Sequence, residues 1–286
     1  MRVAVIGSTG QLGQDLLRVF GDRAIGFAHE DLDVTDPAGV ALAVRSAEPD
    51  WVLNTAAFHR VDDCEEDPTS TFAVNATGAL NVARAAADIG SGVAFYSTDY
   101  VFGGEGRKRD HPYVEQDNPH PLNVYGVSKV AGEQLAMQAN ERHLVVRSAG
   151  LYGTATSRKG WTFPELMINK ARTDGFVRVV TDQVLSPTFT ADLARKTKQL
   201  IEHDARGLFH LTNAGECSWF DFAQKAFEIA GVKARMEPID TGQMKQRARR
   251  PSYSALETSR LGAVGLNPMR PWEEALDDYL KQKDFI

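Results

Sequence analysis

Tyr125 and Lys129 stand four residues apart in the stretch Tyr125-Gly126-Val127-Ser128-Lys129. If this stretch is helical, both side chains project from one face, with their Cβ atoms roughly 5–6 Å apart. A phenol has a pKa of about 10 and holds its proton at neutral pH, but a nearby ammonium favours the phenolate and lowers that pKa. The pair is therefore predicted to move a proton at a bound substrate, with Tyr125 as donor or acceptor.

Thr98 lies upstream in Ser97-Thr98-Asp99-Tyr100 and offers a hydroxyl group. Such a hydroxyl can donate a hydrogen bond to a carbonyl oxygen as negative charge develops there. Together the three side chains predict proton delivery to a carbonyl group, the step that accompanies hydride transfer. A Tyr and a Lys one helical turn apart also occur by chance on helix surfaces, so the prediction depends on the rest of the chain.

The chain begins with elements suited to bind a dinucleotide. Residues 2–6 are a short apolar run, typical of a buried parallel strand. A glycine-rich turn at 7–13 follows directly, and residues 11–20 have helical apolar spacing. Glycines let a pyrophosphate approach the backbone, and the helix N-terminus offers unpaired N–H groups. We therefore predict cofactor contacts at Gly7, Thr9, Gly10, Gln11, Leu12 and Gly13.

The residues after the second predicted strand, at 24–28, bear on the choice of cofactor. The chain continues there with His29-Glu30-Asp31 and has no Arg or Lys. In such folds an acidic residue at this point accepts a hydrogen bond from the adenosine ribose, whereas a basic residue suits a 2′-phosphate. NADH and NADPH both fit the rest of the pattern, and this short stretch favours NADH.

Five more residues are predicted to contact the cofactor. Asp33 and Val34 are placed near the adenine, although Asp33 could equally be an acid in the turn before a helix. Ala56 and Ala57 follow the strand at 51–54, where small residues let a cofactor lie close to the sheet edge. Asn75 is on the helix predicted at 69–89 and either contacts the cofactor or faces solvent.

Strands alternate with helices through the first half of the chain. Further strands are predicted at 92–97 and 143–147, with a helix at 122–140 between them that carries Tyr125 and Lys129. This alternation predicts an α/β fold with a doubly wound parallel sheet of the Rossmann type. Thr98 then emerges at the carboxyl end of a strand, where such sheets bind ligands.

The predicted domain boundary lies near residue 153, because the alternation loosens after it. Residues 1–153 are predicted to form the dinucleotide-binding domain. Residues 154–286 are predicted to form mostly a smaller substrate-binding domain, with a strand at 207–211 that returns to the sheet. The segments 161–170, 190–203, 218–230 and 272–281 are expected to be helical.

Composition excludes several other classes of protein. The chain has 286 residues, of which 43% are hydrophobic and 24% charged, an ordinary globular profile. A net charge of −6 predicts no nucleic-acid surface. No apolar run reaches the ~20 residues of a membrane helix, and the N-terminus reads as a strand rather than a signal peptide. The two cysteines, Cys64 and Cys217, indicate free thiols and a cytoplasmic protein.

Four motifs occur in one order along the chain. They are G-S-T-G-Q-L-G at 7–13, N-T-A-A at 54–57, S-T-D-Y-V-F at 97–102 and P-L-N-V-Y-G-V-S-K-V-A-G-E at 121–133. In this order they resemble the extended branch of the short-chain dehydrogenase/reductase superfamily, and more closely the dTDP-4-dehydrorhamnose reductase family. The resemblance implies reduction of a nucleotide-linked 4-keto-6-deoxy sugar by NADH or NADPH, in dTDP-rhamnose biosynthesis for cell-surface polysaccharides.

The resemblance also assigns roles to residues. Tyr125 gives a proton to the C4 oxygen, Lys129 lowers the tyrosine pKa and holds the nicotinamide ribose, and Thr98 polarises the oxygen. Thr98, Asp99 and Phe102 are expected to contact the substrate. Arg250 begins a segment that matches the family's R-P-x-x-S-x-L and is expected to contact the substrate diphosphate, because an Arg fork suits phosphate oxygens. Without the resemblance, Arg250 and the nearby Arg247 and Arg249 would be interpreted as a charged surface exposed to solvent.

The sequence departs from the family pattern at four places. Gly150 stands where the family's R-T-S-W-x-Y-G has Trp, and Leu185 stands where its D-Q-x-G has Gly. Thr162-Phe163 replaces N-F, and residues 58–60 replace small or hydroxyl residues. All four are expected near the sugar, so the sugar's identity, the nucleotide base and the stereochemistry at C4 stay open.

Two other functions fit the same motifs. One is an epimerase or dehydratase of the superfamily, although dehydratases usually add acidic residues beside the threonine. The other is a regulatory subunit resembling that of methionine adenosyltransferase, which binds dinucleotide without catalysis. Some relatives form homodimers through an acidic, magnesium-bound interface. Asp15 is one carboxylate at such a position, so we predict no metal site and regard a homodimer as possible.

Overall fold

The central element is a parallel sheet, found in a computed structural model that describes residues 1–105, 109–155 and 160–286. Within these residues six strands lie in the order β10-β5-β4-β3-β1-β2, and every pairing between neighbours is parallel. The strands are β1 (Val3–Ile6), β2 (Ala24–Phe27), β3 (Trp51–Asn54), β4 (Gly92–Thr98), β5 (His143–Ser148) and β10 (Gly207–His210). The predicted doubly wound fold is confirmed.

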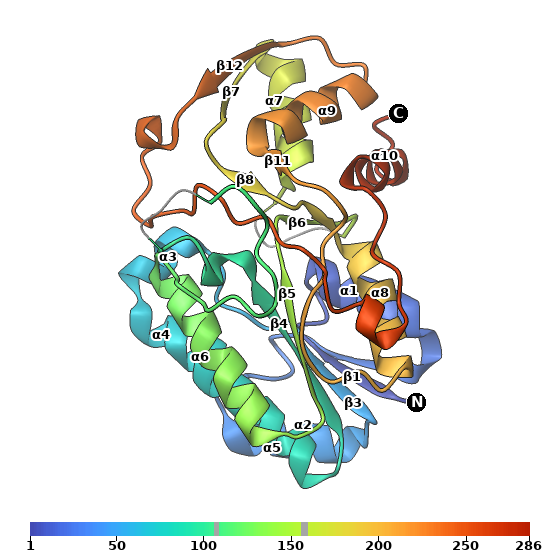
Figure 1. Ribbon diagram of the computed structural model, residues 1–286. Helices are drawn as coiled ribbons and strands as arrows, with labels where there is room; N and C mark the ends of the chain where they lie inside the picture. Colours follow the sequence, from blue (N-terminus) through green and yellow to red (C-terminus); the bar gives the residue numbers. More distant parts are fainter. Residues whose placement is uncertain (106–108, 156–159) are drawn as a thin grey trace.

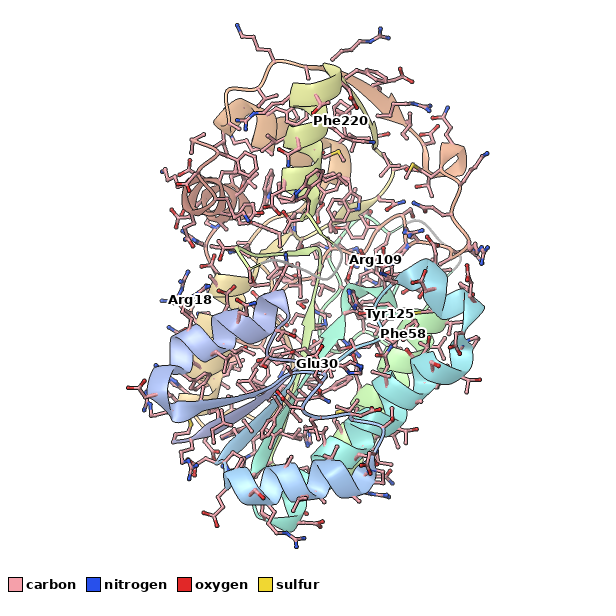
Figure 2. All side chains as sticks on the ribbon, turned by 180° about the vertical axis from the view of Figure 1, so that it is seen from behind. Arg18, Glu30, Phe58, Arg109, Tyr125 and Phe220 are labelled. Atoms are coloured by element: carbon pink, nitrogen blue, oxygen red, sulfur yellow. The ribbon has the colours of Figure 1, made fainter. Side chains whose placement is uncertain are left out.

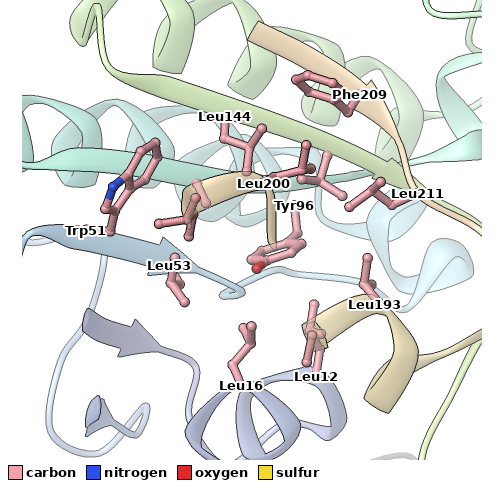
Figure 3. Packing of buried hydrophobic residues seen from close by; sticks show 14 of the residues in the cluster. Leu12, Leu16, Trp51, Leu53, Tyr96, Leu144, Leu193, Leu200, Phe209 and Leu211 are labelled. Carbon is pink, nitrogen blue, oxygen red and sulfur yellow. The ribbon is translucent and has the colours of Figure 1, made fainter. Parts of the chain in front are cut away.

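Helices cover both faces of this sheet (Figure 1). Figure 3 shows the apolar cluster on one face, where α1 (Gln11–Phe20) and α8 (Thr190–Glu202) pack against the strands. The other face is covered by α2 (Pro37–Ala47), α5 (Gly78–Asp88) and α6 (Val124–Ala139). Strand alternation divides the residues between the faces: Val3 and Val5 belong to the first cluster, Ala4 and Ile6 to the second.

The sheet order creates a crevice between β1 and β3. The chain leaves β1 for α1 on one face, whereas the helices that follow β3 lie on the other face. Ligands of open α/β sheets bind outside the carboxyl ends of the strands at such a reversal. The glycine turn after β1 and residues 55–57 after β3 therefore meet at one place.

A second lobe lies beyond the carboxyl ends of the strands (Figure 1). It contains α7 (Phe163–Asp174), α9 (Trp219–Ile229) and α10 (Trp272–Gln282), with the parallel pair β7 (Phe176–Val180) and β12 (Arg235–Ile239). Two shorter pairs join β8 (Val184–Leu185) to β11 (Cys217–Ser218), and β6 (Leu151–Tyr152) to β9 (Thr188–Phe189). Stacked and edge-on aromatic rings of Tyr152, Phe189, Phe222 and Tyr279 form much of its core.

Two predicted helices differ from the observed ones. The helix predicted at 69–89 is divided into α4 (Pro68–Phe72), a π-helical turn (Ala73–Thr77) and α5. The helix predicted from residue 161 begins at Phe163, because Thr162 and Glu165 form a capping box at its start. The remaining helical segments are α3 (Val61–Glu66) and short 3₁₀ turns at Gly21–Arg23, Asp99–Val101, Thr241–Gln243 and Gly262–Val264.

None of the helices that the structure describes is long and apolar enough to cross a membrane.

Candidate active site

A cleft of about 710 Å³ lies between the sheet and the second lobe, within the size range of ligand sites. Most of the predicted site residues line it. These are Gly7, Thr9, Gly10, Gln11, Leu12, Gly13, Asp33, Val34, Ala56, Ala57, Thr98, Asp99, Tyr125 and Lys129. Figure 2 shows Tyr125 and Phe58, which both line the cleft, just below the second lobe.

The glycine turn has no room for side chains at two positions. Gly7 has φ +80°, and a Cβ there would lie 2.5 Å from the Thr55 hydroxyl oxygen. A Cβ on Gly13 would lie 2.3 Å from the Gly7 carbonyl oxygen and 2.9 Å from the Ser8 Cα. The turn therefore packs closely against β3 and α1, leaving a backbone cradle that fits a dinucleotide pyrophosphate.

The variant Gly13→Ala should weaken dinucleotide binding roughly 5- to 150-fold, because overpacking costs about 1–3 kcal/mol. Cofactor titration followed by fluorescence measures the effect. Gly242→Ala is the matched control, since a Cβ at Gly242 meets nothing within 4 Å. Unchanged binding by Gly13→Ala would show that the turn does not hold the cofactor.

The predicted catalytic residues are held by β4 and the first turns of α6. Thr98 ends β4, and the Asn123 side chain caps α6 by accepting a hydrogen bond from the Gly126 N–H at 2.8 Å. Lys129 is buried and its Nζ donates to the Tyr96 carbonyl oxygen at 2.6 Å. Burial lowers the Lys129 pKa to about 7, although the charge of Glu133 opposes this.

The predicted effect of Lys129 on Tyr125 is wrong in this structure. The pKa of Tyr125 is raised rather than lowered, chiefly because the ring is buried and secondly because Asp99 is negatively charged. A hydrogen bond with Thr98 opposes the rise. The physical reason is that desolvation penalises the phenolate, while the Lys129 ammonium is directed to a backbone carbonyl. Tyr125 is therefore a protonated phenol at neutral pH.

Asp99 supports Thr98 and does not offer a free carboxylate to the cleft. Its Oδ1 accepts from the Thr98 hydroxyl at 3.0 Å, and its Oδ2 accepts from the Ser254 hydroxyl at 2.6 Å. Burial raises the Asp99 pKa to about 6, against these hydrogen bonds. Asp99 lines the cleft and supports Thr98 through one of these hydrogen bonds, and its contact with the substrate stays a prediction.

The raised pKa of Asp99 predicts a pH-dependent stability. Between about pH 3.8 and pH 6 the native state binds more protons at Asp99 than the unfolded state does. The free energy of unfolding therefore falls as the pH rises through this window, and the contribution of Asp99 is lost above pH 6. Asp99→Asn removes this titration. From pH 4 to pH 7 the free energy of unfolding of wild type should therefore fall by up to about 3 kcal/mol more than that of the variant. Urea unfolding at both pH values measures it, with the exposed Asp63→Asn as control. Parallel pH dependences for the Asp99→Asn variant and wild type would contradict the prediction.

Asn75 and Phe102 are not among the described residues that line the cleft. Asn75 is buried in the π-helical turn, where its amide bonds the backbone N–H and C=O of Phe58 and the Ser128 hydroxyl. It therefore positions Phe58, which does line the cleft. Phe102 is fully buried and stacks on Tyr113 at 4.1 Å between ring centroids. The prediction that its side chain contacts substrate is therefore wrong.

Arg250 also lies outside the described lining, next to Pro251, which is part of it. Its guanidinium pairs with Asp62 at 3.2 Å, and Asp62 also accepts the backbone N–H groups of Arg247 and Ala248. This network fastens the segment before Pro251 to α3 at the edge of the cleft. A substrate phosphate would have to share Arg250 with Asp62.

Asp15 is held by contacts within the chain. It is buried beneath α8, accepts from the Thr190 hydroxyl at 2.6 Å and pairs with Arg18. Burial raises its pKa. In the ranges 1–105, 109–155 and 160–286, no group of three or more His, Cys, Asp or Glu residues could hold a metal ion.

Several cleft residues were not predicted from the sequence as contacts. Most follow strands or come from the second lobe, and their positions in the fold give the only signal. They are Val61, Tyr100, Ser148, Gln183, Trp219 and Ser254.

Fold and site together define an extended short-chain dehydrogenase/reductase, in which a Thr, Tyr and Lys lie beside a dinucleotide crevice. The chain belongs to the family described as "RmlD substrate binding domain", which matches residues 1–285. This confirms the resemblance to the dTDP-4-dehydrorhamnose reductase family.

Individual relatives are similar over almost the whole chain. The "Spore coat polysaccharide biosynthesis protein SpsK" of Bacillus subtilis (strain 168) is 35% identical over 99% of this chain and 98% of its own length. A dTDP-4-dehydrorhamnose reductase of Mycolicibacterium smegmatis is 38% identical over 97% of this chain and 84% of its own. A solved Bacillus anthracis dTDP-4-dehydrorhamnose reductase in complex with NADP has a TM-score of 0.93 and 35% identity, covering 98% of this chain and 99% of the other.

Proposed function

We propose that this protein is an NAD(P)H-dependent reductase of a nucleotide-linked 4-keto-6-deoxy sugar, with dTDP-4-dehydrorhamnose as the leading substrate. The observation that carries the proposal is the meeting of Thr98, Tyr125 and Lys129 in one cleft with the glycine turn. The names of its relatives supply the substrate class.

The residues divide the work at the C4 carbonyl. When bound, the reduced nicotinamide supplies a hydride to the carbonyl carbon. Tyr125 gives its phenolic proton to the carbonyl oxygen, which becomes a hydroxyl. The Thr98 hydroxyl, which donates to Asp99 Oδ1 in this structure, turns to donate its hydrogen bond to the same oxygen as charge develops there. Lys129 lies one helical turn from Tyr125, and its proposed role is to hold the nicotinamide ribose.

Absorbance of reduced nicotinamide tests the proposal directly. Purified protein is mixed with NADH or NADPH and enzymatically prepared dTDP-6-deoxy-L-lyxo-4-hexulose. Oxidation that depends on the sugar supports the reductase. Cofactor binding without oxidation of any 4-keto sugar would overturn it and favour a regulatory subunit.

We further propose a preference for NADH over NADPH, supported by the acidic residues at 30 and 31 and by His29 at the cleft. Repulsion of a 2′-phosphate by an exposed carboxylate costs about 1 kcal/mol, so kcat/KM should favour NADH about fivefold. His29→Arg should move the ratio toward NADPH. Equal ratios in wild type and variant would contradict the proposed role of this turn.

The two lobes have separate proposed roles. The sheet and its helices bind the dinucleotide, and the second lobe binds the nucleotide sugar over the carboxyl ends of the strands. Two elements from the second half of the chain belong to the dinucleotide lobe: β10 is a strand of the central sheet, and α8 packs on one of its faces. We propose that the enzyme acts in the cytoplasm, where its cofactor and nucleotide sugar are made. We also propose that it can form a homodimer, which sedimentation velocity tests.

A further inference from the structure

Gly150 and Leu185 are in contact, although 35 positions separate them in the sequence. Gly150 has φ +50°, and a Cβ there would lie only 2.5 Å from the Leu185 Cδ1 and 3.6 Å from the Trp219 Cη2. These two residues are also two of the four departures from the family pattern. The Leu185 side chain therefore occupies space that a side chain at position 150 would need.

Leu185 and Trp219 are packed among other elements of the second lobe. Leu185 is in β8, whose antiparallel partner β11 places Cys217 opposite it. Trp219 begins α9, and its ring lies 4.4 Å from that of Phe163 between centroids. The backbone N–H of Trp219 also donates to the Gln183 carbonyl oxygen at 3.3 Å. Leu185 and Trp219 thus form an apolar wall that neighbouring elements of the second lobe support.

This wall lies close to the reacting group. Thr98 pairs with Ser148 on the neighbouring strand, and Gly150 follows two residues later. Gly150, Leu185 and Trp219 all line the same cleft as Thr98 and Tyr125. Leu185 is only 4% exposed, so most of its side chain is packed inside the wall and little of it faces the cleft. Trp219 is partly exposed to the cleft.

We propose that Leu185 and Trp219 form an apolar seat for the C6 methyl group of the sugar and thereby select a 6-deoxy substrate. C6 is attached to C5, the neighbour of C4, so a sugar with its C4 carbonyl at Thr98 and Tyr125 must place its C6 nearby. A hydroxyl at C6 would be desolvated against carbon atoms and left without a partner. The inference rests on the proposed function and names the substrate feature that the site selects.

Calorimetry with cofactor-saturated protein tests the seat, using dTDP-L-rhamnose and dTDP-L-mannose, which share the C5 configuration of the proposed product and differ from each other only by the C6 hydroxyl. Wild type should bind the deoxy compound roughly tenfold more tightly. Leu185→Ala opens space for the hydroxyl and should reduce the ratio to about twofold or less. Trp161→Phe is the control, because Trp161 is 60% exposed and lies outside the described lining. It should keep the wild-type ratio.

A second pair of measurements keeps the proposal testable if Leu185→Ala folds poorly. Quenching of tryptophan fluorescence by the deoxy ligand should be lost in Trp219→Phe and kept in Trp161→Phe. Gly150→Ala should lower the Tm, and Leu185→Ala in the same chain should restore part of it by removing the close contact.

The outcomes separate the inference from the proposed function. Sugar-dependent turnover with an unchanged deoxy-to-hydroxy ratio in Leu185→Ala, or with quenching intact in Trp219→Phe, overturns the seat and leaves the reductase standing. Failure of wild type to bind either nucleotide sugar overturns the proposed function, and the seat with it.

Discussion

Replacing Tyr125 with Phe is expected to lower sugar-dependent turnover by roughly 10²–10⁴-fold, the range for loss of a general acid. The ring keeps its place because its edge-on packing against Tyr100, with centroids 6.0 Å apart, does not use the hydroxyl. Burial keeps the Tyr125 pKa high, so the phenol carries the proton that the reaction needs. Dinucleotide affinity should change little.

Steady-state kinetics and a separate cofactor titration distinguish the two effects. Tyr253→Phe is the matched control, because Tyr253 lies outside the described lining of the cleft. Near wild-type turnover in Tyr125→Phe would remove Tyr125 as proton donor and require another acid.

Replacing Glu133 with Ala is expected to destabilise the protein by about 3–5 kcal/mol, the cost of leaving a buried charge unpaired. Glu133 on α6 accepts two hydrogen bonds from Arg147 on β5, at 2.8 and 2.7 Å. Glu133 is fully buried and Arg147 is 3% exposed, so water cannot replace the lost partner. The charge of Glu133 also raises the pKa of Lys129, and its loss should lower that pKa further.

Urea unfolding measures the change in stability. Asp277→Ala serves as the control, because it breaks an exposed i,i+4 pair with Lys281 and should change stability by about 0.5 kcal/mol or less. The double variant Glu133→Leu/Arg147→Met should recover much of the loss, since it removes both charges of the pair. A Glu133→Ala variant as stable as the Asp277→Ala control would contradict the buried pair.

Local patterns in the sequence predicted the framework of the site. A short apolar strand, a glycine turn and an amphipathic helix place the dinucleotide cradle, because glycine's freedom and helix periodicity are properties of a few adjacent residues. The four-residue spacing of Tyr125 and Lys129 likewise depends only on α6. Thr98 follows from its place at the end of a strand, since parallel strands present their carboxyl ends at one edge.

The tertiary structure alone decided how these residues are tuned and what surrounds the sugar. Ser254 reaches Asp99 across 155 positions, and Leu185 reaches Gly150 from the second lobe. The pKa values of Tyr125, Lys129 and Asp99 depend mainly on burial, which is set by distant segments that cover them. Spacing along one helix determines which groups can meet, but desolvation and packing depend on what the rest of the chain brings against them.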